Sequence, residues 1–122
     1  MAGLVETIAG RRILFFAESG PLLAASGDAN DLISEVWGHE ADMAVLPLSR
    51  LGPDFLKLST RIAGDVIQKF VNYNIQLVIL GDVQVHAANS GALRDFIYES
   101  NNGRFVWFLP DEGTLRIKLD AT

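Results

Sequence analysis

Short apolar runs recur along the chain and predict five β-strands. Residues 4–8 and 13–17 are the first two, and the turn residues 9–12 between them predict a β-hairpin. Three later runs, each stopped by glycine, proline or a polar residue, have the pattern of buried strands and span 43–48, 77–80 and 105–109. The run 77–80 is the most hydrophobic, which favours a central position in the sheet.

Apolar residues at helical spacing predict helices between the later strands and after the last one. The first helix begins at the N-cap residue Asp28 and ends at Gly38. A later helix begins at Asn89 or Ser90, and residues 114–119 form a final short helix. The side chains expected to share one face are Leu32, Ile33, Val36 and Trp37 in the first helix and Leu93, Phe96 and Ile97 in the later one.

The longest helix is predicted from Pro53 to about Tyr73. Its apolar residues recur every three or four positions, as Phe55, Leu58, Ile62, Val66 and Phe70. A glycine inside a helix costs roughly 1 kcal/mol relative to alanine. We therefore expect close packing of the helix at Gly64, against the sheet or another helix, to offset that cost.

The order of elements is β-β-α-β-α-β-α-β-α, which predicts an α/β fold with a single five-stranded sheet. Strands that alternate with helices pair in parallel, and the initial hairpin adds one antiparallel pair. The sheet is therefore expected to be mixed and mainly parallel, with helices mainly on one face. A chain of 122 residues suits one domain, residues 1–122.

Composition narrows the classes of function. Hydrophobic residues make up 49% of the chain, so either a second subunit covers apolar surface or the sheet is buried on both faces. The net charge is −5 and basic residues are scattered, which disfavours binding to nucleic acid or to a membrane surface. The absence of cysteine excludes disulfides, thiolate nucleophiles and cysteine-ligated zinc. No apolar run has the length of a signal peptide or a membrane span, so a cytoplasmic location is expected.

Ligands of open α/β sheets bind beyond the carboxyl ends of the strands. This rule selects Ser49 and Arg50 after one strand and Asp82 and His86 after another, as a candidate ligand or interaction edge. Asp82 and His86 are either an acid–base pair or a helix-capping aspartate beside an exposed histidine. With two histidines and no metal-binding spacing, His39 is expected to be an exposed turn residue, and no metal or cofactor is expected.

A second candidate lies on the outer side of the helix that begins near residue 90. Arg94 and Tyr98 lie four positions apart there, and arginine beside tyrosine is a pair found at interface hot spots. The alternative is an ordinary solvated helix face. Both readings stay open at this point.

The block 58–73 is similar to the central block of the bacterial domain of unknown function 4180 family, and 81–82 and 93–101 resemble its later blocks in the same order. That resemblance implies no activity. The order of elements and the segment 46–51 are more distantly similar to STAS domains, the modules typified by anti-sigma-factor antagonists. STAS domains are switched by phosphorylation of a serine at a helix start. The corresponding stretch 52–55 contains no serine, so a phosphorylation switch of that kind is not expected here.

These features predict a non-enzymatic regulatory or protein-interaction module that associates with a protein partner or with itself as a homodimer. The alternative is a small-ligand-binding protein or enzyme whose site lies at the carboxyl ends of the strands. A site of that second kind would place Arg50, Asp82 and His86 around one concave pocket.

Overall fold

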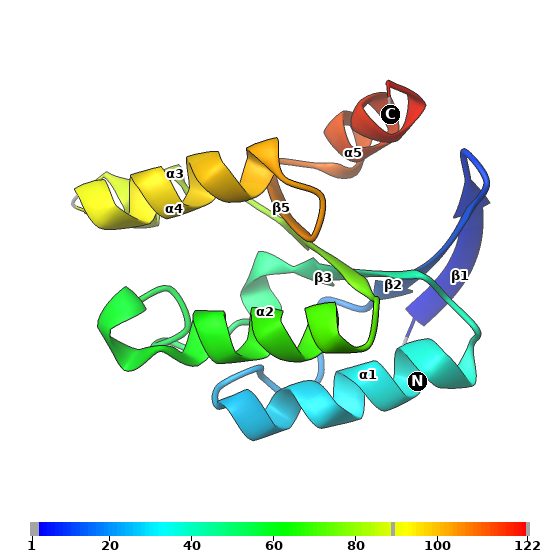
Figure 1. Cartoon of the computed structure of the whole chain (residues 1–122), viewed down its shortest axis with the longest axis horizontal. Coiled ribbons are helices and arrows are strands. Elements are labelled where there is room, and N and C mark those ends of the chain that lie inside the picture. The colour runs from blue at the N-terminus through cyan, green and yellow to red at the C-terminus, as the bar shows by residue number, and fades with distance from the viewer. Residues whose placement is uncertain (1–2, 89, 122) are drawn as a thin grey trace.

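The computed structural model describes residues 3–88 and 90–121. It forms one five-stranded sheet with the strand order β1-β2-β3-β4-β5 (Figure 1). The first pair is antiparallel and the other three pairs are parallel, so the predicted mixed, mainly parallel sheet is confirmed. The strands are β1 Gly3–Ile8, β2 Arg11–Phe16, β3 Met43–Pro47, β4 Gln76–Leu80 and β5 Val106–Leu109.

Helices connect and cover these strands. The three-residue 3₁₀ turns are η1 Ser26–Asp28, η2 Leu48–Arg50 and η3 Leu58–Thr60. The α-helices are α1 Ala29–Gly38, α2 Ile62–Asn72, α3 Gln84–Ala87, α4 Gly91–Asn102 and α5 Glu112–Asp120. None of the helices in the described part of the chain combines the length and apolar character needed to cross a bilayer.

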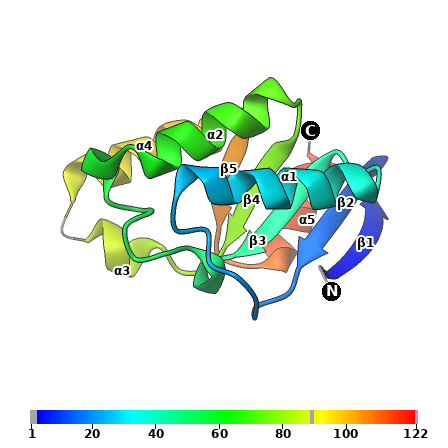
Figure 2. The same ribbon diagram turned by 90° about the horizontal axis from the view of Figure 1, so that it is seen from below.

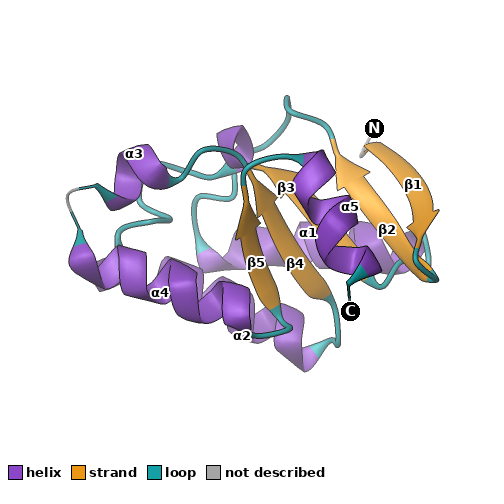
Figure 3. Cartoon of the chain, turned by 90° about the horizontal axis from the view of Figure 1, so that it is seen from above, coloured by secondary structure: helices purple, strands orange, loops and turns teal. Residues whose placement is uncertain are grey.

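The two faces of the sheet are covered unequally. Helices α1, α2 and α4 pack on one face and form the larger core, and Figure 2 shows α1 and α2 lying across that face. Helix α5 lies on the opposite face, where Leu115 and Leu119 cover a smaller core (Figure 3). The sheet is thus apolar on both sides, which by itself accounts for much of the hydrophobic composition.

The hairpin is tighter than the sequence suggested. Its loop contains only Ala9 and Gly10, with φ angles of 52° and 80°, and both basic residues that follow belong to β2. Positive φ at both loop positions is the geometry that matches the twist of the flanking strands. The strand β4 is an interior strand, but β3 rather than β4 occupies the middle of the sheet.

The predicted long helix is the main error. No helix begins at Pro53: α2 starts at Ile62, and Phe55 is fully buried from a turn rather than from a helix. Gly64 is exposed, and a Cβ added there would meet no neighbouring atom within 4 Å, so the expected close packing is absent. The hydroxyl residues before α2 are Ser59 and Thr60, which lie outside the stretch 52–55 that we compared with STAS domains.

Several helix ends also differ from the prediction. Gly38 is the last residue of α1, and the chain reverses at Glu40, whose φ is 56°. Trp37 is 58% exposed and stacks edge-on against Tyr73 at a ring-centroid distance of 5.1 Å, instead of facing the core. Ser90 caps α4 by accepting the Leu93 N–H at 3.1 Å, whereas Asn89 lies outside the described residues.

Candidate functional site

A loop that follows β2 forms one wall of a groove beside α1. We name residues 17–23 the strap. The strap leaves the end of β2 and leads into η1 and α1 (Figure 2). Ser49 and Arg50, which follow β3, hydrogen-bond to it, so it lies near the carboxyl ends of the parallel strands. This is the region that the rule for ligand sites in α/β sheets selects.

Arg50 holds the strap in place through hydrogen bonds to its carbonyl groups. Its side chain is 6% exposed; Nε donates a hydrogen bond to the carbonyl oxygen of Pro21 and Nη1 donates one to that of Ala17, both at 2.9 Å. Gly20 lies directly over the guanidinium, because a Cβ built at Gly20 would lie 2.9 Å from Arg50 Cζ. The Phe16 ring lies 6.0 Å from Arg50 Cζ and adds a cation–π contact.

Backbone hydrogen bonds close the far end of the strap. The Leu23 N–H donates to the carbonyl of Arg50 at 2.7 Å, and the Gly52 N–H donates to the carbonyl of Leu23 at 2.9 Å. The Asp28 carboxylate then accepts the N–H groups of Ala24 and Ala25 at 3.0 and 2.9 Å. The strap is therefore held at both ends, and its position relative to α1 is fixed.

The groove between the strap and α1, which we name the strap groove, has a volume of about 350 Å³. Its apolar residues come from the strap, α1 and the end of β3. Its polar residues are mainly carboxylates of α1 and the residue before it. The lining residues are Pro21, Leu22, Leu23, Asp28, Asp31, Leu32, Ser34, Glu35, Leu46 and Arg50.

Acidic groups dominate the charge of the strap groove. Asp28, Asp31 and Glu35 follow one another at spacings of three and four residues, so they form a stripe along one side of α1. The ion pairs within the described residues join Lys57 to Asp54 and Arg116 to Glu6 and Glu112, so none of them neutralises this stripe. Arg50 supplies the one positive charge among the lining residues.

The sequence-predicted edge residues take separate positions. Ser49 is exposed, and its hydroxyl donates to the carbonyl of Glu18 in the strap at 3.3 Å, beside the bonds made by Arg50. Asp82 Oδ1 accepts the N–H of Gln84, the first residue of α3, at 2.9 Å. His86 is exposed and lines a different groove, of about 430 Å³, together with Lys57 and the start of α4. Ser49 and Arg50 thus act together, whereas Asp82 and His86 lie away from the strap groove.

The second predicted pair does share a surface. Arg94 and Tyr98 both line a shallow groove of about 430 Å³ between α3 and α4, and Tyr98 is 71% exposed. The predicted exposed turn position of His39 is confirmed, with Nδ1 lying 2.8 Å from the carbonyl of Glu35. In residues 3–88 and 90–121, no group of histidine, aspartate and glutamate side chains converges as metal ligands would.

The residues of α1 that line the strap groove were missed from the sequence. Neither Asp31 nor Glu35 is among the candidate site residues that the sequence indicates. The available signal was the helical spacing of Asp28, Asp31 and Glu35, which places all three on one stripe. The spacing alone does not show that a loop from before the helix folds back beside that stripe.

Comparisons with known proteins identify a family and no closer relative. A family model described as domain of unknown function 4180 matches residues 8–119, almost the whole chain. No curated protein matches the chain. No solved structure matches it either, so the more distant resemblance to STAS domains is not confirmed.

Proposed function

The chain belongs to the domain of unknown function 4180 family, and since that description assigns no activity, we propose from its geometry that it is a non-enzymatic protein-interaction module. The strap groove is the binding site in this proposal. Its occupant is a segment of a partner protein that carries basic and apolar side chains. The observation that carries the proposal is the combination, in one fixed groove, of an apolar floor with an unneutralised acidic rim.

The apolar part of the groove supplies affinity without specificity. Leu22 is about half exposed, while Leu23, Leu32 and Leu46 are buried beneath it and shape the floor. Burial of apolar surface contributes roughly 25 cal/mol per Å² removed from water. One or two leucine-sized side chains of a bound segment would therefore provide the main favourable term.

The acidic rim selects the charge of the occupant. Asp31 and Glu35 are exposed and carry no ion pair within the described residues, so a lysine or arginine of the partner meets two available carboxylates. An acidic segment would instead face like charges, which disfavour it. Arg50 does not reverse this balance, because its guanidinium is buried and already donates to two strap carbonyls.

The positions of the titratable edge residues favour binding over catalysis. General acid–base chemistry requires the acid and base to lie within hydrogen-bond reach of one reacting group. Asp82 accepts the Gln84 N–H at the start of α3, and His86 lines a groove other than the one that Arg50 lines. These placements support the choice of an interaction module.

The test uses a capped synthetic peptide that alternates leucine and lysine, and a matched peptide with glutamate in place of lysine. Binding to the protein is followed by isothermal titration and by amide chemical-shift changes. We expect the lysine peptide to bind, with shifts concentrated at Leu22, Leu32 and Ser34, and the glutamate peptide to bind at least about tenfold more weakly, a difference of about 1.4 kcal/mol.

Charge-reversal variants distinguish binding in the strap groove from attraction by the net charge of the protein. The double variant Asp31→Lys, Glu35→Lys should lose the lysine peptide. The control Asp65→Lys, Asp95→Lys makes the same change in net charge at exposed sites on α2 and α4 and should retain it. Equal losses in both double variants, or shifts spread over the whole surface, would show that only net charge attracts the peptide.

A further inference from the structure

The outward backbone groups of the two edge strands, β1 and β5, differ in their hydrogen-bond partners. At the β5 edge, the Asn101 side chain at the end of α4 bonds to the backbone of Phe108 twice. Asn101 Nδ2 donates to the Phe108 carbonyl at 3.1 Å, and the Phe108 N–H donates to Asn101 Oδ1 at 2.7 Å. An amide side chain in this position replaces the backbone of a neighbouring strand. The outward backbone groups of β5 are thereby occupied at Phe108.

The β1 edge has no such cover among the described residues. In the strand order β1 is the last strand on its side, and Figures 1 and 3 place it at the rim of the molecule. Exposed strand edges present a row of unpaired N–H and C=O groups that can template another strand. Leu4, the second residue of this strand, is 76% exposed.

The hairpin geometry shows which backbone groups of β1 are free. Ile8 and Arg11 flank the two-residue loop, so they form a hydrogen-bonded pair, and such pairs alternate with non-hydrogen-bonded ones. Glu6 and Leu4 therefore bond to β2 as well. The N–H and C=O groups of Val5 and Thr7, together with those of Gly3, point outward.

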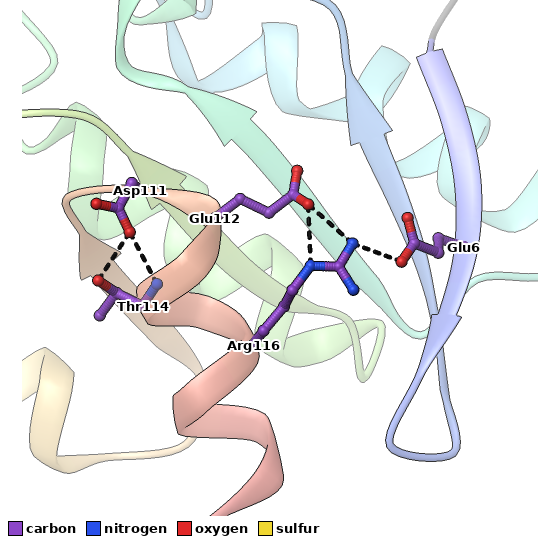
Figure 4. Close-up of polar contacts among 5 residues, drawn as sticks. All are labelled: Glu6, Asp111, Glu112, Thr114 and Arg116. Atoms are coloured by element: carbon purple, nitrogen blue, oxygen red, sulfur yellow. Dashed lines mark hydrogen bonds and ion pairs between the residues drawn. The ribbon is translucent and has the colours of Figure 1, made fainter.

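Glu6, the one charged residue of β1, pairs with an arginine of α5. Arg116 Nη2 of α5 lies 2.6 Å from Glu6 Oε2 and 2.8 Å from Glu112 Oε2 (Figure 4). The hydrogen bonds to Glu112 and to Glu6 also raise the pKa of the Arg116 guanidinium, so it remains charged. A charged side chain is a common guard against edge pairing, but here the Glu6 carboxylate is held by Arg116 of the same molecule.

From these observations we infer that β1 pairs antiparallel with β1 of a second copy of the chain, with Val5 opposite Val5 of the partner subunit. This register aligns the outward groups of Gly3 with those of Thr7 and extends the sheet to ten strands across a two-fold axis. A register centred on Glu6 would instead set two carboxylates directly opposite each other, which is unfavourable. The inference is independent of the strap groove.

The size of this contact sets the expected strength of the dimer. Only residues 3–7 of each strand pair, and interfaces below about 1,200 Å² of total buried area belong to the weak, transient class. The dimer should therefore populate in a concentration-dependent way. Sedimentation equilibrium should follow it between about 10 µM and 1 mM, the range of dissociation constants typical of weak contacts.

Cysteine cross-linking tests the register, because the chain contains no cysteine of its own. Across a hydrogen-bonded antiparallel pair the Cα atoms lie about 5.5 Å apart, within disulfide range. Val5→Cys should therefore form a disulfide-linked dimer under mild oxidation. The matched control Thr7→Cys should not, because its two sulfur-bearing residues would be four positions out of register, about 13 Å apart.

A backbone variant tests the edge itself. Thr7→Pro removes an outward N–H without removing a bond to β2, and proline is tolerated on edge strands at such positions. We expect it to remain folded by circular dichroism and to sediment as a monomer. A wild-type monomer at 1 mM would overturn the inference. Cross-linking of Thr7→Cys as fast as Val5→Cys would overturn it too, as would a dimer that Thr7→Pro leaves unchanged.

Discussion

The substitution Arg50→Lys tests whether the guanidinium of Arg50 holds the strap. Lysine keeps the positive charge and most of the aliphatic side chain, but it lacks the planar set of donors that reaches two carbonyls at once. Arg50 donates to Ala17 and Pro21 at 2.9 Å from a site that is almost completely buried. We therefore expect the substitution to weaken the strap specifically.

The magnitude follows from the lost hydrogen bond. A hydrogen bond from a charged donor contributes about 1.5–3 kcal/mol, and lysine can replace one of the two, so the free energy of unfolding should fall by about 2 kcal/mol. For an m-value of about 2 kcal/mol/M, the urea midpoint should fall by about 1 M. Ser49→Ala is the matched control, since its hydroxyl is exposed and its bond to the strap is 3.3 Å long. That control should change stability by less than about 0.5 kcal/mol.

Hydrogen exchange locates the effect. The Leu23 and Gly52 amides donate between the strap and the segment that carries Arg50, so their exchange should accelerate in Arg50→Lys more than exchange in the strands does. Two results would refute the reasoning. One is a loss of stability no larger than that of Ser49→Ala. The other is a global loss in which these two amides keep their protection relative to the core.

Three further substitutions have effects that the structure predicts. Gly64→Ala should raise the free energy of unfolding by about 0.5 kcal/mol, because the site is open and helical. Gly81→Ala should lower the free energy of unfolding by more than 1 kcal/mol, because φ at Gly81 is 153° and the new Cβ would lie 2.5 Å from Leu48 Cβ. Equal urea midpoints for the two glycine variants would contradict both expectations. The backbone N–H and the hydroxyl of Thr114 donate to the Asp111 carboxylate and lower the pKa of Asp111 below 3.8 (Figure 4). The charged carboxylate therefore stabilises the fold above pH 3.8. This contribution is lost as the pH falls through the lowered pKa of the folded state. Asp111→Asn should therefore flatten the loss of stability below about pH 4, measured by urea unfolding, and an unchanged acid slope would contradict this.

The order of strands and helices could be predicted because each apolar run is bounded by residues that stop it. The segment 53–61 could not, because helical spacing of apolar residues reports burial rather than backbone conformation. Phe55 and Leu58 face the core from turns, and the chain enters α2 only after Arg61, whose φ is 64°. The Thr60 hydroxyl accepts the Ile62 N–H at 3.3 Å and serves the start of the helix instead.

The position of Trp37 shows a second limit of periodicity. Trp37 lies four residues after Ile33 and one after Val36, so its spacing matches the buried face of α1. That position falls in the last turn of the helix, and there the side chain meets Tyr73 at the end of α2 rather than the sheet. Periodicity identifies the face of a helix, but tertiary packing decides how much of each turn the sheet covers.

The candidate site depended on contacts that no local pattern contains. The rule for strand ends selected Arg50, and the structure places it at the strap groove, but its bonds reach residues 29 and 33 positions earlier in the chain. Those bonds bring the strap beside α1 and so create the groove in which the carboxylates of Asp31 and Glu35 are available. An arginine after a strand therefore indicates a loop that it holds as much as a ligand that it contacts. If support of the strap is its role, Arg50→Lys should weaken peptide binding and strap protection together, whereas loss of binding with the strap intact would mean that the guanidinium contacts the bound segment itself.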